Sequence, residues 1–349
     1  MVSGPLHGIA RYALELARRV PELEPGWQFV GLVAPEGLPD DLGDLRPRIP
    51  LSHAGTEFLS PWEQPSLLAS LVRLRADLFH ATSFSVPALW PGRLVATLHD
   101  ANHVALPQGE QTLKAAYYRT VVAPRCRRAR AIITVSQFSR EELVSHLGLS
   151  PQSMAVIANG VDVHYRPQAP AAVRDFCTRR GLTQPYFAAV GSAKPFKNMA
   201  LLREVAPRLP APVAMLAGRG TKRLFALPDS VIELAPLPEE DMPLYYSGAT
   251  ALLFPSRYEG FGFPALEAMA CGTPVVVSDS TALPELVGPA GLTAGPDDVG
   301  AWVAAGYRLF SDANLRSALS TKSQERARSY AWSECARHTV DIYRRALAT

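Results

Sequence analysis

Residues 254–272 have the sequence FPSRYEGFGFPALEAMACG, and this stretch predicts both a fold and a ligand site. An apolar run ends at Phe254, a loop with two glycines follows, Pro264 suits a first helical turn, and Gly272 suits a helix end. We therefore expect a strand, a loop and a helix, which is the repeating unit of a parallel α/β sheet. Free N–H groups at the start of such a helix attract an anion, typically a phosphate.

Two glutamates accompany this predicted anion site. Glu259 lies in the loop and Glu267 lies one turn inside the helix. Carboxylates beside an anion site are electrostatically unfavourable unless each accepts hydrogen bonds from ligand hydroxyls, so the stretch favours a phosphorylated ligand rich in hydroxyl groups. The simpler interpretation is a capped helix whose acidic residue interacts with the helix dipole. The stretch alone does not decide between these two interpretations.

The rest of the chain continues the same α/β pattern. Short β-branched runs alternate with longer amphipathic stretches, which is typical of parallel sheets. We expect helices at 11–20 and 111–128, and strands at 28–34, 77–81, 94–98, 131–135, 154–157, 186–190, 213–217, 231–234, 250–254 and 274–278. The fold class is therefore α/β, with two Rossmann-like parallel-sheet domains of similar size and a ligand cleft between them at the strand ends.

The predicted domains are residues 1–165 and 166–330, followed by a helical segment at 331–349. A length of 349 residues agrees with two domains. The first periodic segment, Gly8–Val20, is already helical and only seven residues precede it. We therefore expect the first domain to lack the strand that normally opens a doubly wound sheet.

Composition excludes several classes of protein. Lys+Arg 35 against Asp+Glu 32 gives a net charge of +3, without the excess typical of nucleic-acid binding. The four cysteines form no C-x-x-C pair, which argues against a zinc knuckle or disulfide framework. Neither a signal peptide nor an apolar run long enough to span a membrane is visible. We expect a cytoplasmic protein with at most peripheral membrane association.

A second candidate site is the segment VGSAKPFKN at 190–198, at the carboxyl end of a predicted strand. It contains two of the chain's five lysines, Lys194 and Lys197, and Lys222 follows the next strand, shortly after Arg219. Lysine is a compact point charge suited to phosphate. The alternative is that these are ordinary surface lysines.

The segment TLHDANH at 97–103 is the third candidate, because His99 follows a strand end and a histidine there could hydrogen-bond a reacting group. A structural histidine is the alternative. His80 and the segment Trp62-Glu63-Gln64 are weaker candidates. A basic run could contact anionic lipid, although a solvated helix face is the simpler interpretation; it comprises Arg119, Arg125, Arg127, Arg128 and Arg130.

Several mechanisms lack their motifs. The chain has no G-x-x-x-x-G-K-[ST], H-E-x-x-H or G-x-S-x-G. It also has no D-x-D, so a Mg²⁺ or Mn²⁺ ion on a diphosphate would lack an obvious ligand pair, and we expect no metal site. Residues 260–265 do match G-x-G-x-x-A, with Asp279 nineteen residues after Gly260, which allows a nicotinamide or flavin oxidoreductase as a distant alternative. Five residues separate Phe254 from Gly260, however, where that fingerprint requires a tight turn.

Taken together, these segments resemble the retaining GT-B glycosyltransferases of family 4, above all the mannosyltransferase-like branch. The most specific match is Glu259 and Glu267 within GFGFPALEAMACGTPVV. Further matches run along the chain in the family's order: GIARY at 8–12, WEQ at 62–64, TLHD at 97–100, VSQFS at 135–139, NGVD at 159–162, the Gly191 loop and AWS at 331–333. The resemblance implies that the segment 331–349 is a helix that crosses back to the first domain.

The resemblance also implies a role for each candidate residue. Lys197 would contact the donor diphosphate beside the Gly191 and Ser192 backbone, Glu267 would hold the ribose hydroxyls, and Glu259 would bind the transferred sugar. The remaining donor-side positions would be Gly8, Arg219, Phe261, Gly262 and Phe263. His99 would lie near the anomeric carbon and the acceptor. Members of the family often have arginine where this chain has Phe196, and Lys194 could replace that charge.

The resulting hypothesis is a metal-independent, retaining transfer of a hexose, mannose from GDP-mannose, to a hydroxyl of a carbohydrate, lipid-linked or natural-product acceptor. The nucleotide-diphosphate sugar would be a co-substrate, and no cofactor is expected. An alternative hypothesis is a catalytically inactive or partner-dependent GT-B protein that binds a nucleotide sugar without turnover. Phe196 and the missing strand motivate this alternative.

Overall fold

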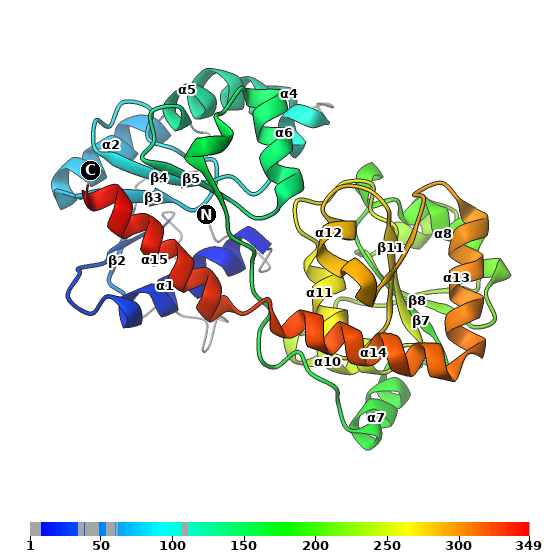
Figure 1. The fold of residues 1–349 in the computed structure, drawn as a ribbon. Coiled ribbons are helices and arrows are strands. Elements are labelled where there is room, and N and C mark those ends of the chain that lie inside the picture. The colour runs from blue at the N-terminus through cyan, green and yellow to red at the C-terminus, as the bar shows by residue number, and fades with distance from the viewer. Residues whose placement is uncertain are drawn as a thin grey trace. The chain divides into compact units, whose positions relative to one another are not determined.

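A computed structural model describes residues 8–33, 38, 49–53, 60, 62–106 and 111–348. The chain divides into two compact units. The N-terminal unit comprises residues 1–160 together with 332–349, and the C-terminal unit comprises residues 161–331. We predicted that the segment before Gly8 does not supply an opening strand. That segment, residues 1–7, lies outside the described residues. Figure 1 shows the fold, coloured from blue at the N-terminus to red at the C-terminus.

The C-terminal unit is built on a six-stranded parallel sheet. Its strand order is β12-β11-β10-β7-β8-β9. The strands are β7 (Phe187–Val190), β8 (Val213–Leu216), β9 (Val231–Glu233), β10 (Ala251–Phe254), β11 (Val275–Ser278) and β12 (Leu292–Ala294). The chain runs outward from β7 to β9 on one side and from β10 to β12 on the other. The strand order therefore reverses between β7 and β10, and α/β sheets bind ligands at such a reversal.

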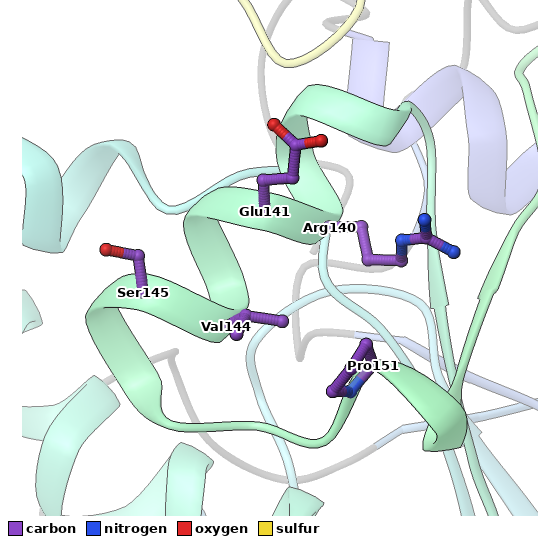
Figure 2. Close-up of a pocket in the computed structure, with 5 residues that line it drawn as sticks. All are labelled: Arg140, Glu141, Val144, Ser145 and Pro151. Atoms are coloured by element: carbon purple, nitrogen blue, oxygen red, sulfur yellow. The ribbon is translucent and has the colours of Figure 1, made fainter.

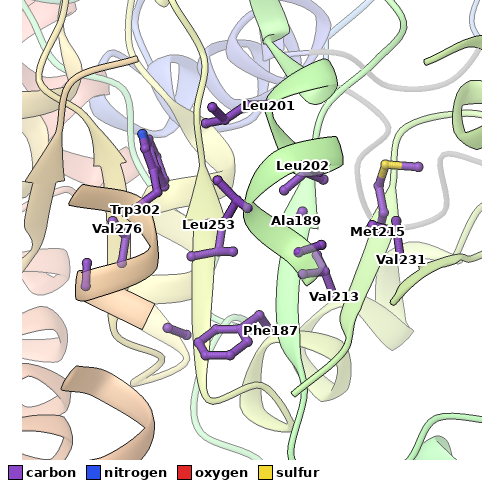
Figure 3. Packing of buried hydrophobic residues seen from close by; sticks show 14 of the residues in the cluster. Phe187, Ala189, Leu201, Leu202, Val213, Met215, Val231, Leu253, Val276 and Trp302 are labelled. Carbon is purple, nitrogen blue, oxygen red and sulfur yellow. The ribbon is translucent and has the colours of Figure 1, made fainter. Parts of the chain in front are cut away.

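Helices cover both faces of this sheet. Helices α8 (Leu202–Val205) and α13 (Val299–Ser311) lie on one side, and α10 (Met242–Ser247), α11 (Phe263–Ala270) and α12 (Leu283–Val287) lie on the other (Figure 1). The unit also contains α7 (Pro170–Arg180), α9 (Thr221–Leu224) and α14 (Ala313–Arg328). On the α13 side, alternate strand residues such as Phe187, Val213 and Leu253 belong to the same buried hydrophobic cluster as Trp302 (Figure 3). Burial on both faces explains why these strands are almost entirely apolar.

The N-terminal unit contains a smaller parallel sheet. Its order is β3-β4-β5-β6, formed by β3 (Leu78–Ala81), β4 (Arg93–Thr97), β5 (Ala131–Thr134) and β6 (Met154–Val156). A separate pair joins β1 (Gly31–Val33) to β2 (Leu51–His53). The strand predicted at 28–34 is thus shorter than expected, and β2 was not predicted.

In the N-terminal unit, helices from the two ends of the described chain pack against each other. Helix α15 (Trp332–Ala348) packs along α1 (Gly8–Leu23) and against β4 (Figure 1). The others are α2 (Glu63–Leu74), α3 (Asn102–Ala105), α4 (Gln111–Tyr117), α5 (Ala123–Cys126) and α6 (Gln137–Leu147). The helix predicted at 111–128 includes a π-helical turn at Tyr118–Val122, which ends two residues before Pro124. Proline has no N–H for an ordinary helical bond, and the wider turn agrees with this.

Gly160 lies where the first 160 residues meet α15. A Cβ on Gly160 would lie 2.3 Å from the backbone N of Trp332. No side chain fits at that distance, so the close backbone approach requires glycine. This explains the glycine of the NGVD segment as a packing residue.

Candidate active site

The loops that follow β7 and β10 meet at the point where the strand order reverses. They bring Lys197 and Glu259 together, with 2.6 Å between Lys197 Nζ and Glu259 Oε1. The Lys197 side chain is 22% exposed and that of Glu259 is 12% exposed. The lysine predicted to contact phosphate and the glutamate predicted to contact sugar therefore form one ion pair, although 62 positions separate them in the sequence.

The loop after β7 is fixed by tight packing and by backbone hydrogen bonds. A Cβ on Gly191 would lie 2.8 Å from Cε of Met199, so the glycine allows the chain to pass over that side chain. A short 3₁₀ turn, Pro195–Lys197, ends at Asn198, whose φ is 55° and whose side-chain amide donates to the Pro296 carbonyl at 2.7 Å. This turn presents the Lys197 side chain on a constrained backbone.

A backbone hydrogen bond joins the two loops directly. The Arg257 N–H donates to the Phe196 carbonyl at 2.7 Å. Two cations lie near the Phe196 ring, with Lys194 Nζ 5.8 Å and Lys197 Nζ 5.6 Å from its centroid. Cations within about 6 Å of an aromatic face are attracted by its quadrupole. Phe196 therefore packs beside both lysines at the position where arginine was expected.

Helix α11 begins at the end of the second loop. Gly262 precedes it with a φ of 108°, and a Cβ there would lie 2.7 Å from Cδ2 of Leu283. Phe261 and Phe263 contact each other on either side of this glycine, with 5.2 Å between ring centroids. The loop from Phe254 to Phe263 is longer than the tight turn of a dinucleotide-binding fingerprint, which argues against the oxidoreductase alternative.

Replacing Gly262 by alanine is expected to destabilise the protein by about 1–3 kcal/mol, because the left-handed backbone disfavours a side chain and Leu283 occupies the space. Urea unfolding followed by circular dichroism measures this change. Gly300→Ala is the matched control, since Gly300 lies inside α13 without a positive φ and alanine is expected to be neutral or stabilising there. Equal stabilities for the two variants would contradict the prediction.

The Glu267 carboxylate is hydrogen-bonded to a buried tyrosine, Tyr246. Its Oε2 accepts a hydrogen bond from the Tyr246 hydroxyl at 2.9 Å. Glu267 is 8% exposed and Tyr246 is fully buried on α10. Burial, and then the nearby Glu267 carboxylate, raise the pKa of Tyr246 well above its usual value, so the hydroxyl keeps its proton and remains a donor.

The other predicted donor-side residues lie at the same carboxyl ends but make weaker contacts. Ser192 Oγ accepts from the Lys194 N–H at 3.4 Å, and Lys194 is exposed. Arg219 follows β8, exposed, between two glycines with φ near 85°. Lys222 lies 3.5 Å from Asp229, so its charge already has a partner within its own loop.

In the N-terminal unit, His99 follows β4 and is fixed by its backbone and its ring. The Ser139 hydroxyl donates to the His99 carbonyl at 2.9 Å, and His99 Nε2 donates to the Thr82 carbonyl at 3.0 Å. Because a carbonyl only accepts, this bond assigns a proton to Nε2. The Tyr12 ring packs edge-on against His99, with 4.9 Å between centroids.

A buried polar network lies behind His99. Thr97 Oγ1 is 2.8 Å from the Tyr12 hydroxyl and 2.8 Å from His80 Nε2, and His80 Nδ1 contacts the Tyr343 hydroxyl on α15. Burial, with a contribution from His99, lowers the pKa of His80 to about 3, so this ring is neutral at physiological pH. His80 therefore has a structural role. Tyr12 and Thr97 lie in the matched segments at 8–12 and 97–100, but no role was predicted for either residue.

The weaker candidates are also structural. Gln64 bonds the Ala88 N–H, the Val86 carbonyl and the Tyr117 hydroxyl, and Glu63 accepts from Ser85. Arg125 of the basic run is buried and donates to the carbonyls of Pro87, Trp90 and Gly92. The interpretation of all five arginines as one solvated face is therefore wrong for Arg125. Its guanidinium donates hydrogen bonds to the backbone carbonyls of a loop.

Gly8 is the first described residue and begins α1. A surface depression of about 300 Å³ lies elsewhere in the same unit, along α6 (Figure 2). Its lining consists of Arg140, Glu141, Val144, Ser145 and Pro151, and includes none of the predicted site residues.

Among the residues that the structure describes, no helix combines the length and apolar character needed to cross a membrane.

Both units resemble known proteins. Residues 6–165 match the family model "Glycosyltransferase Family 4", and residues 184–312 match the model "Glycosyl transferases group 1". The O-antigen chain mannosyltransferase B of Escherichia coli is 29% identical, and the alignment covers 97% of this chain and 96% of that protein. The MMP alpha-(1->4)-mannosyltransferase of Mycolicibacterium hassiacum is 32% identical over 62% of this chain and 54% of that protein.

A solved structure shares the fold across the whole chain. The crystal structure of Anabaena HepE in complex with UDP-glucose has a TM-score of 0.77 at 18% identity, and the match covers 99% of this chain and 98% of that one. The architecture of two parallel-sheet domains is thus the one found in a protein solved with a nucleotide sugar.

Proposed function

Because this chain belongs to the GT-B glycosyltransferases of family 4, we propose that it transfers mannose from GDP-mannose to a hydroxyl of a carbohydrate, lipid-linked or natural-product acceptor. The observation that carries the proposal is the contact between Lys197 and Glu259 at the strand-order reversal. In the proposal this cation binds phosphate and this carboxylate binds sugar hydroxyls, and the contact supports it because the two groups lie one hydrogen bond apart. The mannosyl group is proposed from the two relatives that are named mannosyltransferases.

The proposed donor site uses the two loops and α11. Lys197 binds the diphosphate, assisted by the backbone of Gly191 and Ser192 and by the exposed cations Lys194 and Arg219. The N–H groups of residues 261–263 face the sugar and phosphate, where the helix dipole favours negative charge. Glu259 accepts hydrogen bonds from the sugar, and Glu267 accepts them from the ribose.

The proposed reaction keeps the configuration at the anomeric carbon and needs no metal. The bond from the anomeric carbon to the phosphate oxygen breaks as the acceptor oxygen bonds to that carbon, and the leaving diphosphate takes the proton of the acceptor hydroxyl. Negative charge develops on the leaving diphosphate, and preorganised donors that face this charge lower the barrier. In the proposal, Lys197 and the start of α11 provide such donors, so no metal ion is needed. On the acceptor side, we propose that His99 contacts the acceptor and that Gly8 faces the diphosphate.

A donor panel tests the proposal. The full chain is incubated with GDP-mannose, GDP-fucose, UDP-glucose or UDP-N-acetylglucosamine and a panel of oligosaccharide and lipid-linked acceptors, with and without EDTA. We expect transfer from GDP-mannose, unchanged by EDTA, with the α-configuration retained in the product by NMR. Transfer from a UDP-sugar and not from GDP-mannose would contradict the proposed donor. A product with inverted anomeric configuration would contradict the proposed retaining mechanism.

A further inference from the structure

Tyr246 is a fully buried tyrosine on α10 whose hydroxyl donates to Glu267 Oε2 at 2.9 Å. We propose that Tyr246 is a positioning residue, which holds the Glu267 carboxylate in the orientation that distinguishes a ribonucleotide from a deoxyribonucleotide. This inference rests on the proposed function, because it assumes that Glu267 faces the ribose of a nucleotide sugar.

Tyr246 is itself immobilised on several sides. Its carbonyl accepts a hydrogen bond at 2.7 Å from the hydroxyl of Thr273, just beyond the end of α11. Its ring packs against Tyr245 at 5.5 Å and Tyr165 at 6.2 Å between centroids, and the Tyr165 hydroxyl is bound to Glu239 at 2.6 Å. Helix α10 is therefore bonded both to α11, through the Glu267 carboxylate, and to the segment that follows α11, through Thr273.

This geometry restricts what Glu267 can do. A free glutamate side chain rotates about its terminal bond, whereas a carboxylate with one oxygen bound by a fixed donor has its plane set. Each carboxylate oxygen accepts more than one hydrogen bond, so ligand hydroxyls can still bind Glu267. A preorientated carboxylate favours a pair of neighbouring hydroxyls at a fixed separation, as in a ribose. Without the Tyr246 hydroxyl, the carboxylate loses this restraint on its plane, and we expect its selectivity to fall.

The test measures ribose discrimination by titration calorimetry of the full chain with GDP and UDP and with their 2′-deoxy forms. The wild-type protein is expected to prefer the ribonucleotide by about 10- to 100-fold, which is typical of a hydrogen bond to a charged group. Tyr246→Phe should reduce this ratio to about threefold or less. Tyr186→Phe is the matched control, because it removes another buried tyrosine hydrogen bond to α10, to the Tyr245 carbonyl at 2.6 Å, and should keep the wild-type ratio.

A double-mutant comparison separates positioning from a general loss of stability. If Tyr246 acts through the carboxylate, adding Tyr246→Phe to Glu267→Ala should cause no further loss of nucleotide affinity. The double variant should also be more stable to urea than Glu267→Ala alone, because it removes the hydroxyl that the single change leaves unpaired. The stability arm tests the Tyr246–Glu267 hydrogen bond and the affinity arm tests its effect on binding, and neither requires Tyr246→Phe alone to fold.

An unchanged ribose ratio in Tyr246→Phe, or a further loss in the double variant, would overturn the positioning role. If the wild-type protein binds none of the four nucleotides and no nucleotide sugar, the proposed function fails instead. The two failures are therefore distinguishable.

Discussion

Lys197→Ala is expected to lower kcat/KM for sugar transfer by about 10²- to 10³-fold, the usual cost of removing one donor that stabilises developing charge. The change has two effects in the same direction. It removes the cation proposed for the leaving diphosphate, and it leaves the mostly buried Glu259 carboxylate without the partner that lies 2.6 Å away. An unpaired carboxylate at this position would repel the diphosphate.

Initial rates with GDP-mannose, over a range of donor concentrations, measure this loss. Lys322→Ala is the matched control, because Lys322 is exposed on α14 in the same unit and should behave as wild type. Lys197→Arg keeps the charge and should retain more activity than Lys197→Ala. Activity of Lys197→Ala within about twofold of the control would refute the assignment.

Glu267→Ala is expected to weaken nucleoside diphosphate binding by about 10- to 100-fold, because hydrogen bonds to a charged group contribute about 1.5–3 kcal/mol. It also leaves the buried Tyr246 hydroxyl without its acceptor, at a cost of about 1–3 kcal/mol in the free energy of unfolding. Calorimetry with GDP measures the first effect and urea unfolding measures the second. Glu325→Ala, at an exposed position on α14, should change neither, and unaltered GDP binding in Glu267→Ala would exclude a ribose contact.

The fold was predictable because its strands are buried on both faces. Runs such as ALLF at 251–254 and VVVS at 275–278 have no polar alternation, and the structure confirms strands there. The strand β12, Leu292–Ala294, escaped prediction because three residues flanked by glycines do not form a recognisable run. The strand β2, Leu51–His53, is equally short and more exposed.

The contacts of the site were less predictable than its residues. Lys197 and Glu259 were each singled out from local sequence, but their direct contact depends on which strands are neighbours in the sheet. Tyr246 had no local pattern to identify it, since its partner lies in another helix. Arg125 was grouped with its charged neighbours because its three carbonyl partners lie 33 to 38 positions away.

The arrangement of α15 has a consequence for folding during protein synthesis. The C-terminal unit is continuous from residue 161 to residue 331, so its residues are all available once that segment leaves the ribosome. The N-terminal unit is made first but needs Tyr343 to complete the hydrogen bonds of its buried His80. Although domains usually fold in the order of synthesis, the second unit of this chain can reach its complete fold before the first.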